Sequence, residues 1–325
     1  MPCCRRLPEL SAALAALFWT AAAAGETVLV SNEKGNSITA LDADSLAVIR
    51  TIRVGQRPRG ILLSKDHKFL YICASDDNRI DVLDLDTYTL KPPLPSGPDP
   101  ETFALHPDGN HLYVSNEDNS LVSIVDIAGR RIEGEIPVGV EPEGMAVSPD
   151  GKWTVNTSET TNMAHFVDND SHQVVGNVLV DSRPRHAEWT SDGAQVWVSS
   201  EIGGTVSVID AATRQVVHKI GFAVPGVPKQ AIQAVGIALT KDRKRAFVAL
   251  GPSNRVAVID METFEVVKYL LVGQRVWNLA FNHDESRLFT TNGVSNDISA
   301  IDVPNLRVLK SVTVGNQPWG VVVRP

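Results

Sequence analysis

The sequence predicts an all-β fold, a seven-bladed β-propeller made of four-stranded antiparallel blades. An apolar run that ends in aspartate recurs seven times, at Asp42, Asp84, Asp126, Asp168, Asp210, Asp260 and Asp302. The spacing is 42 residues each time, except for one interval of 50 residues that ends at Asp260. A repeat of this length fits one propeller blade, and the lack of a 3.6-residue apolar period argues against a helical repeat.

Each repeat contains four short segments, which we name strands a to d from the central channel outward. In one repeat they cover residues 144–147, 153–155, 163–167 and 173–180. They alternate apolar and polar residues or are rich in β-branched residues, and turn sequences such as Ser148-Pro149-Asp150-Gly151 join them. The recurring aspartate ends strand c, so we interpret it as a turn residue that binds nearby backbone amides rather than as one of a ring of metal ligands.

The two ends of the chain predict how the ring closes. Residues 27–30 have the sequence of a strand b, whereas residues 320–323 have the sequence of a strand a. We therefore expect the C-terminal strand a to pair with the N-terminal strand b in a composite first blade, which leaves neither strand with an open edge.

Residues 1–24 have the features of a secretory signal peptide, and residues 25–325 are expected to form a single propeller domain. Arg5 and Arg6 precede an apolar stretch that is short for a membrane span, and Ala24 offers a cleavage site. We expect a periplasmic monomer that does not insert into the membrane once the signal is removed. Cys73 is then the only cysteine left, and its apolar neighbours predict a buried structural thiol.

Charge and missing motifs exclude several functions. The formal net charge of −8 argues against a nucleic-acid partner and an anionic membrane surface. We find no Cys-x-x-Cys-His motif for covalent haem, no glycine-rich phosphate loop, no Ser-His-Asp order and no zinc-type cluster. The sequence therefore nominates no catalytic residue, no metal ligand and no cofactor.

The repeats differ most in the loop from strand d to the next strand a, at the mouth of the channel. A proline recurs there, at Pro58, Pro100, Pro142, Pro184 and Pro318. The position after it carries Arg59, Glu101, Glu143, Arg185, Val235, Trp277 and Trp319 in successive loops, and the position before it carries Arg57, Asp99, Glu141, Arg183, Arg275 and Gln317 in all but one loop. Charged groups that converge with indole rings suit a small-ligand or docking site, whereas solvated salt bridges between neighbouring loops are the alternative interpretation.

The turns from strand b to strand c share this rim and add carboxylates. Equivalent turns carry Glu33, Glu117, Glu159 and Glu201. These oxygens could bind a hard cation such as Ca²⁺, although no spacing resembles an EF-hand loop. His186 and Glu159 would make an acid–base pair if they meet, while His165 and His186 also fit structural roles. Eight extra residues near 222–230 lengthen one rim loop and could form a lip over the channel.

Two sets of sequence stretches resemble known families. Residues 112–116 and 147–152 resemble the YVTN-repeat β-propellers, and residues 54–60, 96–101, 156–165 and 269–277 are similar to the β-propeller proteins associated with PQQ-dependent catabolism. The chain departs from the pattern at Lys65-Asp66-His67, where Pro-Asp-Gly is usual. The resemblance implies an accessory protein that works beside quinoprotein alcohol dehydrogenases and c-type cytochromes, and it implies no particular reaction.

These observations lead to a predicted binding site and to competing functions. The predicted binding residues are Arg57, Arg59, Glu101, Glu143, Glu159, Arg185, His186, Trp277 and Trp319. We expect a non-enzymatic docking module for a quinoprotein dehydrogenase, a c-type cytochrome or a small anionic ligand such as PQQ, whose carboxylates would suit Arg59 and Arg185. The alternatives are a metal-assisted lyase or lactonase with His186 or His165 as base, and a structural or surface-layer role.

Overall fold

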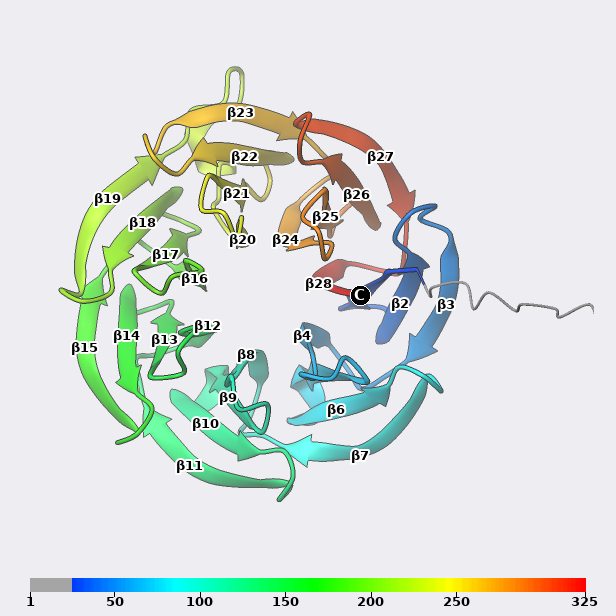
Figure 1. Cartoon of the computed structure of the whole chain (residues 1–325), viewed down its shortest axis with the longest axis vertical. Helices are drawn as coiled ribbons and strands as arrows, with labels where there is room; N and C mark the ends of the chain where they lie inside the picture. The colour runs from blue at the N-terminus through cyan, green and yellow to red at the C-terminus, as the bar shows by residue number, and fades with distance from the viewer. Residues whose placement is uncertain (1–24) are drawn as a thin grey trace, which may run out of the picture.

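The computed structural model describes residues 25–325 as a closed ring of seven four-stranded antiparallel sheets (Figure 1). The predicted signal peptide, residues 1–24, lies outside the described residues. The strands within each blade run from the innermost to the outermost in the order a, b, c, d, as the repeat predicts. None of the helices in the described part of the chain is long and apolar enough to cross a membrane.

The strand bounds are as follows, blade by blade. Blade 1 holds β28 (Pro318–Arg324), β1 (Thr27–Asn32), β2 (Ser37–Asp42) and β3 (Val48–Arg53). Blade 2 holds β4 (Pro58–Leu63), β5 (Phe69–Ala74), β6 (Arg79–Asp84) and β7 (Thr89–Pro95). Blade 3 holds β8 (Pro100–Leu105), β9 (His111–Asn116), β10 (Leu121–Asp126) and β11 (Arg131–Pro137). Blade 4 holds β12 (Pro142–Val147), β13 (Trp153–Ser158), β14 (Met163–Asp168) and β15 (Gln173–Leu179).

The remaining blades follow the same plan. Blade 5 holds β16 (Pro184–Trp189), β17 (Gln195–Ser200), β18 (Thr205–Asp210) and β19 (Gln215–Gly221). Blade 6 holds β20 (Ile237–Leu239), β21 (Arg245–Ala249), β22 (Arg255–Asp260) and β23 (Val266–Leu271). Blade 7 holds β24 (Val276–Phe281), β25 (Arg287–Asn292), β26 (Asp297–Asp302) and β27 (Arg307–Thr313). Single 3₁₀ turns lie at η1 (Ser75–Asp77), η2 (Glu117–Asn119) and η3 (Lys229–Ala231).

The ring closes as predicted, by antiparallel pairing of β28 with β1. Val28 lies opposite Val323, Leu29 opposite Val322 and Val30 opposite Val321. The three residues of β1 are fully buried, so the C-terminal strand covers apolar surface that blade 1 would otherwise expose. Figure 1 shows the red C-terminal strand on the inner side of the blue N-terminal blade.

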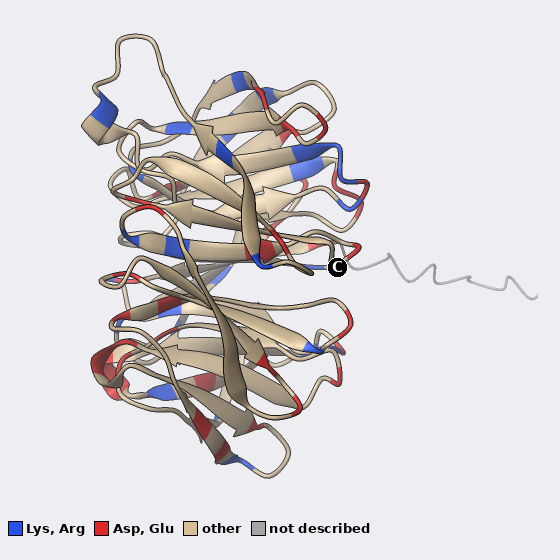
Figure 2. Ribbon diagram, turned by 90° about the vertical axis from the view of Figure 1, so that its left-hand side faces the viewer, with Lys and Arg blue, Asp and Glu red and all other residues tan. Residues whose placement is uncertain are grey.

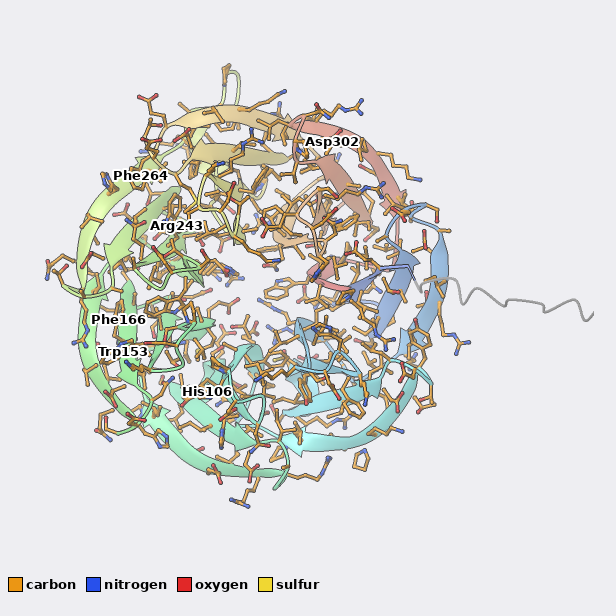
Figure 3. All side chains as sticks on the ribbon, in the orientation of Figure 1. His106, Trp153, Phe166, Arg243, Phe264 and Asp302 are labelled. Carbon is orange, nitrogen blue, oxygen red and sulfur yellow. The ribbon has the colours of Figure 1, made fainter. Side chains whose placement is uncertain are left out.

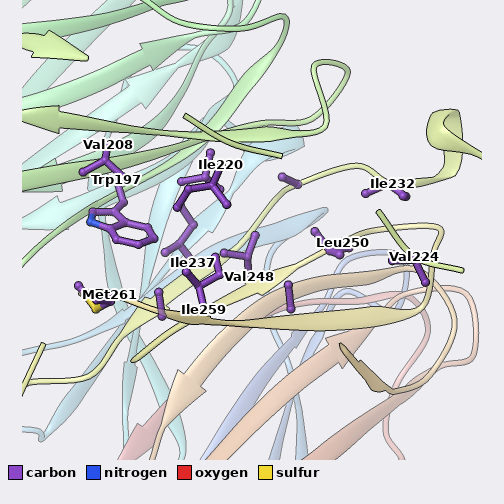
Figure 4. Packing of buried hydrophobic residues seen from close by; sticks show 14 residues of the cluster. Trp197, Val208, Ile220, Val224, Ile232, Ile237, Val248, Leu250, Ile259 and Met261 are labelled. Atoms are coloured by element: carbon purple, nitrogen blue, oxygen red, sulfur yellow. The ribbon is translucent and has the colours of Figure 1, made fainter. Parts of the chain in front are cut away.

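The core lies between adjacent blades, because strands b and c bury both faces of each sheet. Figure 4 shows Trp197 and Val208 of blade 5 packed against Ile237 and Ile259 of blade 6. Trp197 is completely buried. Full burial of an aliphatic side chain such as Val208 contributes about 1.5–3 kcal/mol relative to exposure, so the contacts between blades stabilise the ring.

The recurring aspartates hold turns, as predicted. One carboxylate oxygen of each accepts a hydrogen bond from the amide three residues on, from Asp42 to Ser45 and in the same way through to Asp302 and Asn305. These hydrogen bonds lower the pKa of all seven carboxyls below the ordinary value. Cys73 is also confirmed as a buried free thiol, and burial raises its pKa.

The two faces of the ring carry different connections. We call the side with the d-to-a loops and b-to-c turns the rim face, and the side with the a-to-b hairpins and c-to-d turns the hairpin face. Figure 2 shows the ring edge-on, with the C-terminus on the hairpin face and the long β19–β20 loop projecting on the opposite side.

Candidate functional site

A repeated backbone contact brings the two predicted sets of rim residues together. The residue before each strand-a proline has positive φ, as at Asp99 and Arg183, and its carbonyl accepts a hydrogen bond from the first amide of the b-to-c turn. The Glu117 amide donates to Asp99 at 2.9 Å, and the Glu201 amide donates to Arg183 at 2.8 Å. Charged side chains from both kinds of loop therefore start from adjacent backbone positions at the channel mouth.

Arg57 and Arg59 organise the half of the mouth that blades 1 to 4 contribute. Arg57 binds Asp99 at 2.7 Å and Glu101 at 2.5 Å through its two terminal nitrogens. Arg59 lies 2.7 Å from Glu101 and 3.1 Å from Glu143. Two guanidinium groups thus share one carboxylate, Glu101, whose side chain is fully buried.

Arg185 organises the other half. It contacts Glu159 directly, lies 3.4 Å from Glu143 and lies 3.6 Å from Glu201. Arg183 adds a 2.9 Å contact to Glu159. Because Glu143 faces both Arg59 and Arg185, its carboxylate joins the two halves into one ion-pair network around the mouth.

Burial distinguishes this network from the solvated salt bridges of the alternative interpretation. The side chains of Arg59, Arg185 and Glu143 are 10%, 9% and 2% exposed. The guanidinium groups that we expected to be open to an anionic ligand are therefore already paired with carboxylates. Pairs of this kind are desolvated, and removing one partner leaves an uncompensated buried charge.

The two predicted tryptophans cover the guanidinium groups from the other side. Arg59 lies over the ring of Trp319, 4.6 Å from its centroid, and Arg275 lies over the ring of Trp277 at 4.2 Å. Arg185 also faces Trp277, at 5.7 Å. Cation–π contacts of desolvated arginines contribute about 2 kcal/mol or more, so the indole rings help to fix the network.

Below the network lies a cavity of about 140 Å³ in the central channel. Its walls include Thr102, Glu143, Met145, Arg185, His186 and Asn278. Strand-a backbones approach closely here, and a Cβ on Gly144 would lie 2.9 Å from the Arg185 carbonyl oxygen. Glycine at this position is therefore required for the neighbouring inner strands to meet.

Burial of several carboxyls changes their proton affinity. Desolvation raises the pKa of Glu159 to about 7, and it raises the pKa values of Glu101 and Glu117 above the ordinary value. The carboxylates around Arg185, with Glu143 foremost, raise its pKa against the opposing effect of burial. With a pKa of about 7, the Glu159 carboxyl is partly protonated near neutral pH.

The predicted acid–base pair of His186 and Glu159 does not form. Both oxygens of Glu159 face arginines, and the nearest carboxylate to His186 is that of Glu188, with the two side chains 3.6 Å apart. His165 has the structural role that we considered for it, because its ring accepts a hydrogen bond from the Gly139 amide at 3.0 Å. Burial lowers the pKa of His165.

The predicted set of nine residues left out several members of the network. Glu201 contacts Arg183, Arg185 and Arg275, and Arg275 also binds Gln233 at 2.7 Å. The sequence signal for Glu201 was its repeat position, which matches that of Glu159. Gln233 has a repeat position as well, since it lies two residues before Val235 and matches Arg275, although its β19–β20 loop is lengthened.

The chain is therefore a seven-bladed β-propeller whose channel mouth is closed by a buried network of arginines, carboxylates and indole rings. No protein-family model matches the sequence, and no curated protein matches it either. Hydrazine synthase from Kuenenia stuttgartiensis has a similar structure, with a TM-score of 0.78, 21% identity and coverage of 85% of this chain and 92% of that chain.

Two further solved structures are similar. One is a protein of unknown function from Desulfotomaculum acetoxidans, with a TM-score of 0.79, 15% identity and coverage of 91% of this chain and 98% of that one. The other is the dihydro-heme d1 dehydrogenase NirN, with a TM-score of 0.69, 15% identity and coverage of 91% of this chain and 74% of that one. At these identities the similarity establishes the propeller fold alone.

Proposed function

We propose that the chain is a non-enzymatic docking propeller that binds a protein partner on its rim face. The observation that carries the proposal is the buried network, which ties together loops from blades 1 to 5 and blade 7 and leaves a cavity of about 140 Å³ beneath it. Small-molecule sites usually have about 300–1,000 Å³. The space beneath the network lies below this range, so the exposed surface around the mouth is the better candidate for recognition.

The rim face also has the composition of a docking surface. Ile202 and Val294, each 61% exposed, lie in b-to-c turns, and Val140, 48% exposed, lies in a d-to-a loop. Asp76, whose side chain is 54% exposed, lies in the b-to-c turn of blade 2. Exposed apolar side chains beside charged ones are typical of protein–protein interfaces.

The partner class follows from the sequence resemblance. We propose a periplasmic accessory of quinoprotein alcohol oxidation, with a quinoprotein dehydrogenase or a c-type cytochrome as the partner. The b-to-c turns of blades 2 and 3 carry Asp76, Asp77, Glu117 and Asp118, which suit a partner with a basic surface. Of the two histidines that could serve as base in the lyase or lactonase alternative, His165 accepts a hydrogen bond from the Gly139 amide, and His186 does not meet Glu159.

The test is a binding measurement between the purified mature chain and the quinoprotein dehydrogenase and c-type cytochrome of the same organism. The double variant Ile202→Asp/Val294→Asp should weaken binding at least about tenfold, because it places charges in a desolvated contact. The matched control, Val217→Asp/Val267→Asp, changes valines on the outer strands that are 46% and 54% exposed, and it should bind like the wild type. Equal binding by both double variants, or no binding by the wild type, would overturn the proposal.

A further inference from the structure

A cluster of two histidines and an aspartate lies on the hairpin face, away from the rim network. His106, Asp108 and His111 come from the hairpin that joins β8 to β9, and their ligand-type atoms all lie within 4.8 Å of one another. Figure 3 labels His106 over blade 3. The sequence did not predict this cluster, because its pattern, His-x-Asp-x-x-His, differs from the usual zinc-type spacings of cysteine and histidine.

The hydrogen bonds around the two imidazoles determine which nitrogens carry protons. Nε2 of His106 lies 3.0 Å from the carbonyl oxygen of Gly151, which can only accept, so this nitrogen donates. Nε2 of His111 lies 3.1 Å from Glu133 and donates to that carboxylate. In neutral imidazoles, the Nδ1 atoms of both rings are then unprotonated and available as ligands.

Both Nδ1 atoms point at the same carboxylate oxygen. Nδ1 of His106 lies 2.9 Å from Oδ2 of Asp108, and Nδ1 of His111 lies 2.6 Å from it. The Asp108 amide also approaches Nδ1 of His106 at 3.3 Å, which agrees with an unprotonated nitrogen. A proton on Nδ1 of His111 makes the 2.6 Å contact a hydrogen bond, and a divalent cation that binds here displaces that proton.

The carboxylate is held in place by the hairpin itself. Oδ1 of Asp108 accepts hydrogen bonds from the amides of Asn110 at 2.7 Å and His111 at 3.2 Å. Oδ2 is therefore left for the two imidazoles. Outer partners such as the Gly151 carbonyl and Glu133 are the kind that orient the histidine ligands of metal sites.

Among the described hairpins that join strand a to strand b within a blade, only that of blade 3 has a histidine two residues before the aspartate. At the position of His106 the others carry a donor that binds the aspartate Oδ1 at 2.7 Å, namely Ser64, Ser148, Thr190, Thr240 and Asn282. His106 replaces that donor with an acceptor nitrogen. The fold does not need this change, because five other blades form the same hairpin without it.

We propose that His106, Asp108 and His111 bind one divalent transition-metal ion of the zinc class through Nδ1, Oδ2 and Nδ1. Tetrahedral bonds of about 2.0 Å place neighbouring ligand atoms about 3.3 Å apart, so the two Nδ1–Oδ2 distances of 2.9 Å and 2.6 Å need to lengthen by less than about 1 Å. Two imidazoles and a carboxylate favour zinc over the hard cations Ca²⁺ and Mg²⁺, which prefer all-oxygen sites.

The fourth coordination position is open to an added ligand. The cluster lines a pocket of about 230 Å³, and Asp170 and His172 of blade 4 line it as well. Three protein ligands with one open position are the arrangement in which zinc holds a water molecule or an exogenous donor. The site is independent of the rim face and of its proposed partner.

The test is a calorimetric titration of the untagged, chelator-treated mature chain with Zn²⁺. We expect one equivalent to bind, and we expect His106→Ser and His111→Gln to weaken binding more than about 100-fold. Ser and Gln occupy these repeat positions in other blades, at Ser148 and Gln195, so both variants should keep the wild-type melting temperature. Glu133→Gln, which removes an outer partner, should weaken binding by about 10- to 100-fold.

The matched control is His283→Ser, because His283 is an exposed histidine beside an aspartate in the blade 7 hairpin. It should leave the affinity for Zn²⁺ unchanged. A wild-type chain that binds no Zn²⁺ at about 100 μM, a range of metal concentration in which a three-ligand site is filled, would overturn the proposal. Wild-type affinity in folded His106→Ser, or an equal loss in His283→Ser, would overturn it as well.

Discussion

The pH dependence of stability provides the sharpest test of the rim network. Burial raises the pKa of Glu159 from 4.5 to about 7, and its side chain is only 3% exposed. A carboxyl that holds its proton more tightly in the folded state contributes stability fully below its unfolded pKa and loses it as pH rises through the folded pKa. At about 1.4 kcal/mol per pKa unit, ionisation of Glu159 lowers the free energy of unfolding by about 3 kcal/mol between pH 4.5 and about pH 7.

The assay is urea unfolding of residues 25–325 at about pH 5, 6, 7 and 8. We expect the free energy of unfolding to fall over this range and Glu159→Gln to remove about 1 kcal/mol per pH unit of the slope. Glu101 and Glu117 retain part of the slope in the variant, because burial raises their pKa values too. Glu262→Gln, a change at an exposed carboxyl, should show the same dependence of the free energy of unfolding on pH as the wild type. A wild-type free energy that rises with pH, or an unchanged slope in Glu159→Gln, would refute the reasoning.

Three further changes test the ring and its contacts. Deleting Pro318–Pro325 removes β28, and we expect circular dichroism to show no cooperative thermal transition, whereas a transition near that of the wild type would contradict the closure. Asn162→Ser removes the side-chain oxygen that accepts a 3.1 Å hydrogen bond from the Arg183 amide, and it replaces an asparagine that has positive φ. It should lower the free energy of unfolding in urea by about 1–2 kcal/mol. Ser31→Ala breaks buried hydrogen bonds to the backbone of two neighbouring strands and should cost about 1–2 kcal/mol, while Ser199→Ala at the same repeat position should be nearly neutral because that hydroxyl has no partner.

The fold was predictable because its information is local and repeated. The apolar alternation, the turn sequences and the aspartate spacing recur in every blade, so an ambiguity in one repeat is resolved by the others. Ring closure followed from the points in the repeat at which the chain begins and ends, since residues 27–30 have the sequence of a strand b and residues 320–323 that of a strand a. Pairing of β28 with β1 confirms that inference.

The contacts of the site were less predictable, because they cross several blades. Sequence placed Arg59 and Glu143 on the same rim, but the contact between them spans 84 positions along the chain. The carboxylate that each guanidinium binds depends on side-chain reach and burial, which repeat position does not specify. For this reason the arginines that we expected to meet an anionic ligand proved to be paired with glutamates inside the protein.

Residues that differ between the blades fall into two kinds, those that keep the hydrogen bonds of the repeat and those that lose one. At the rim, the variable residues start from the same backbone hydrogen bonds in most blades, so the fold tolerates many side chains there and function is free to select among them. In the blade 3 hairpin, His106 gives up a hydrogen bond to the aspartate that five other hairpins keep. Asp108 instead meets the ring of His111, whose Nδ1 lies 2.6 Å from Oδ2, so two imidazoles and one carboxylate converge in place of the lost contact. This donor set suits a divalent metal ion of the zinc class.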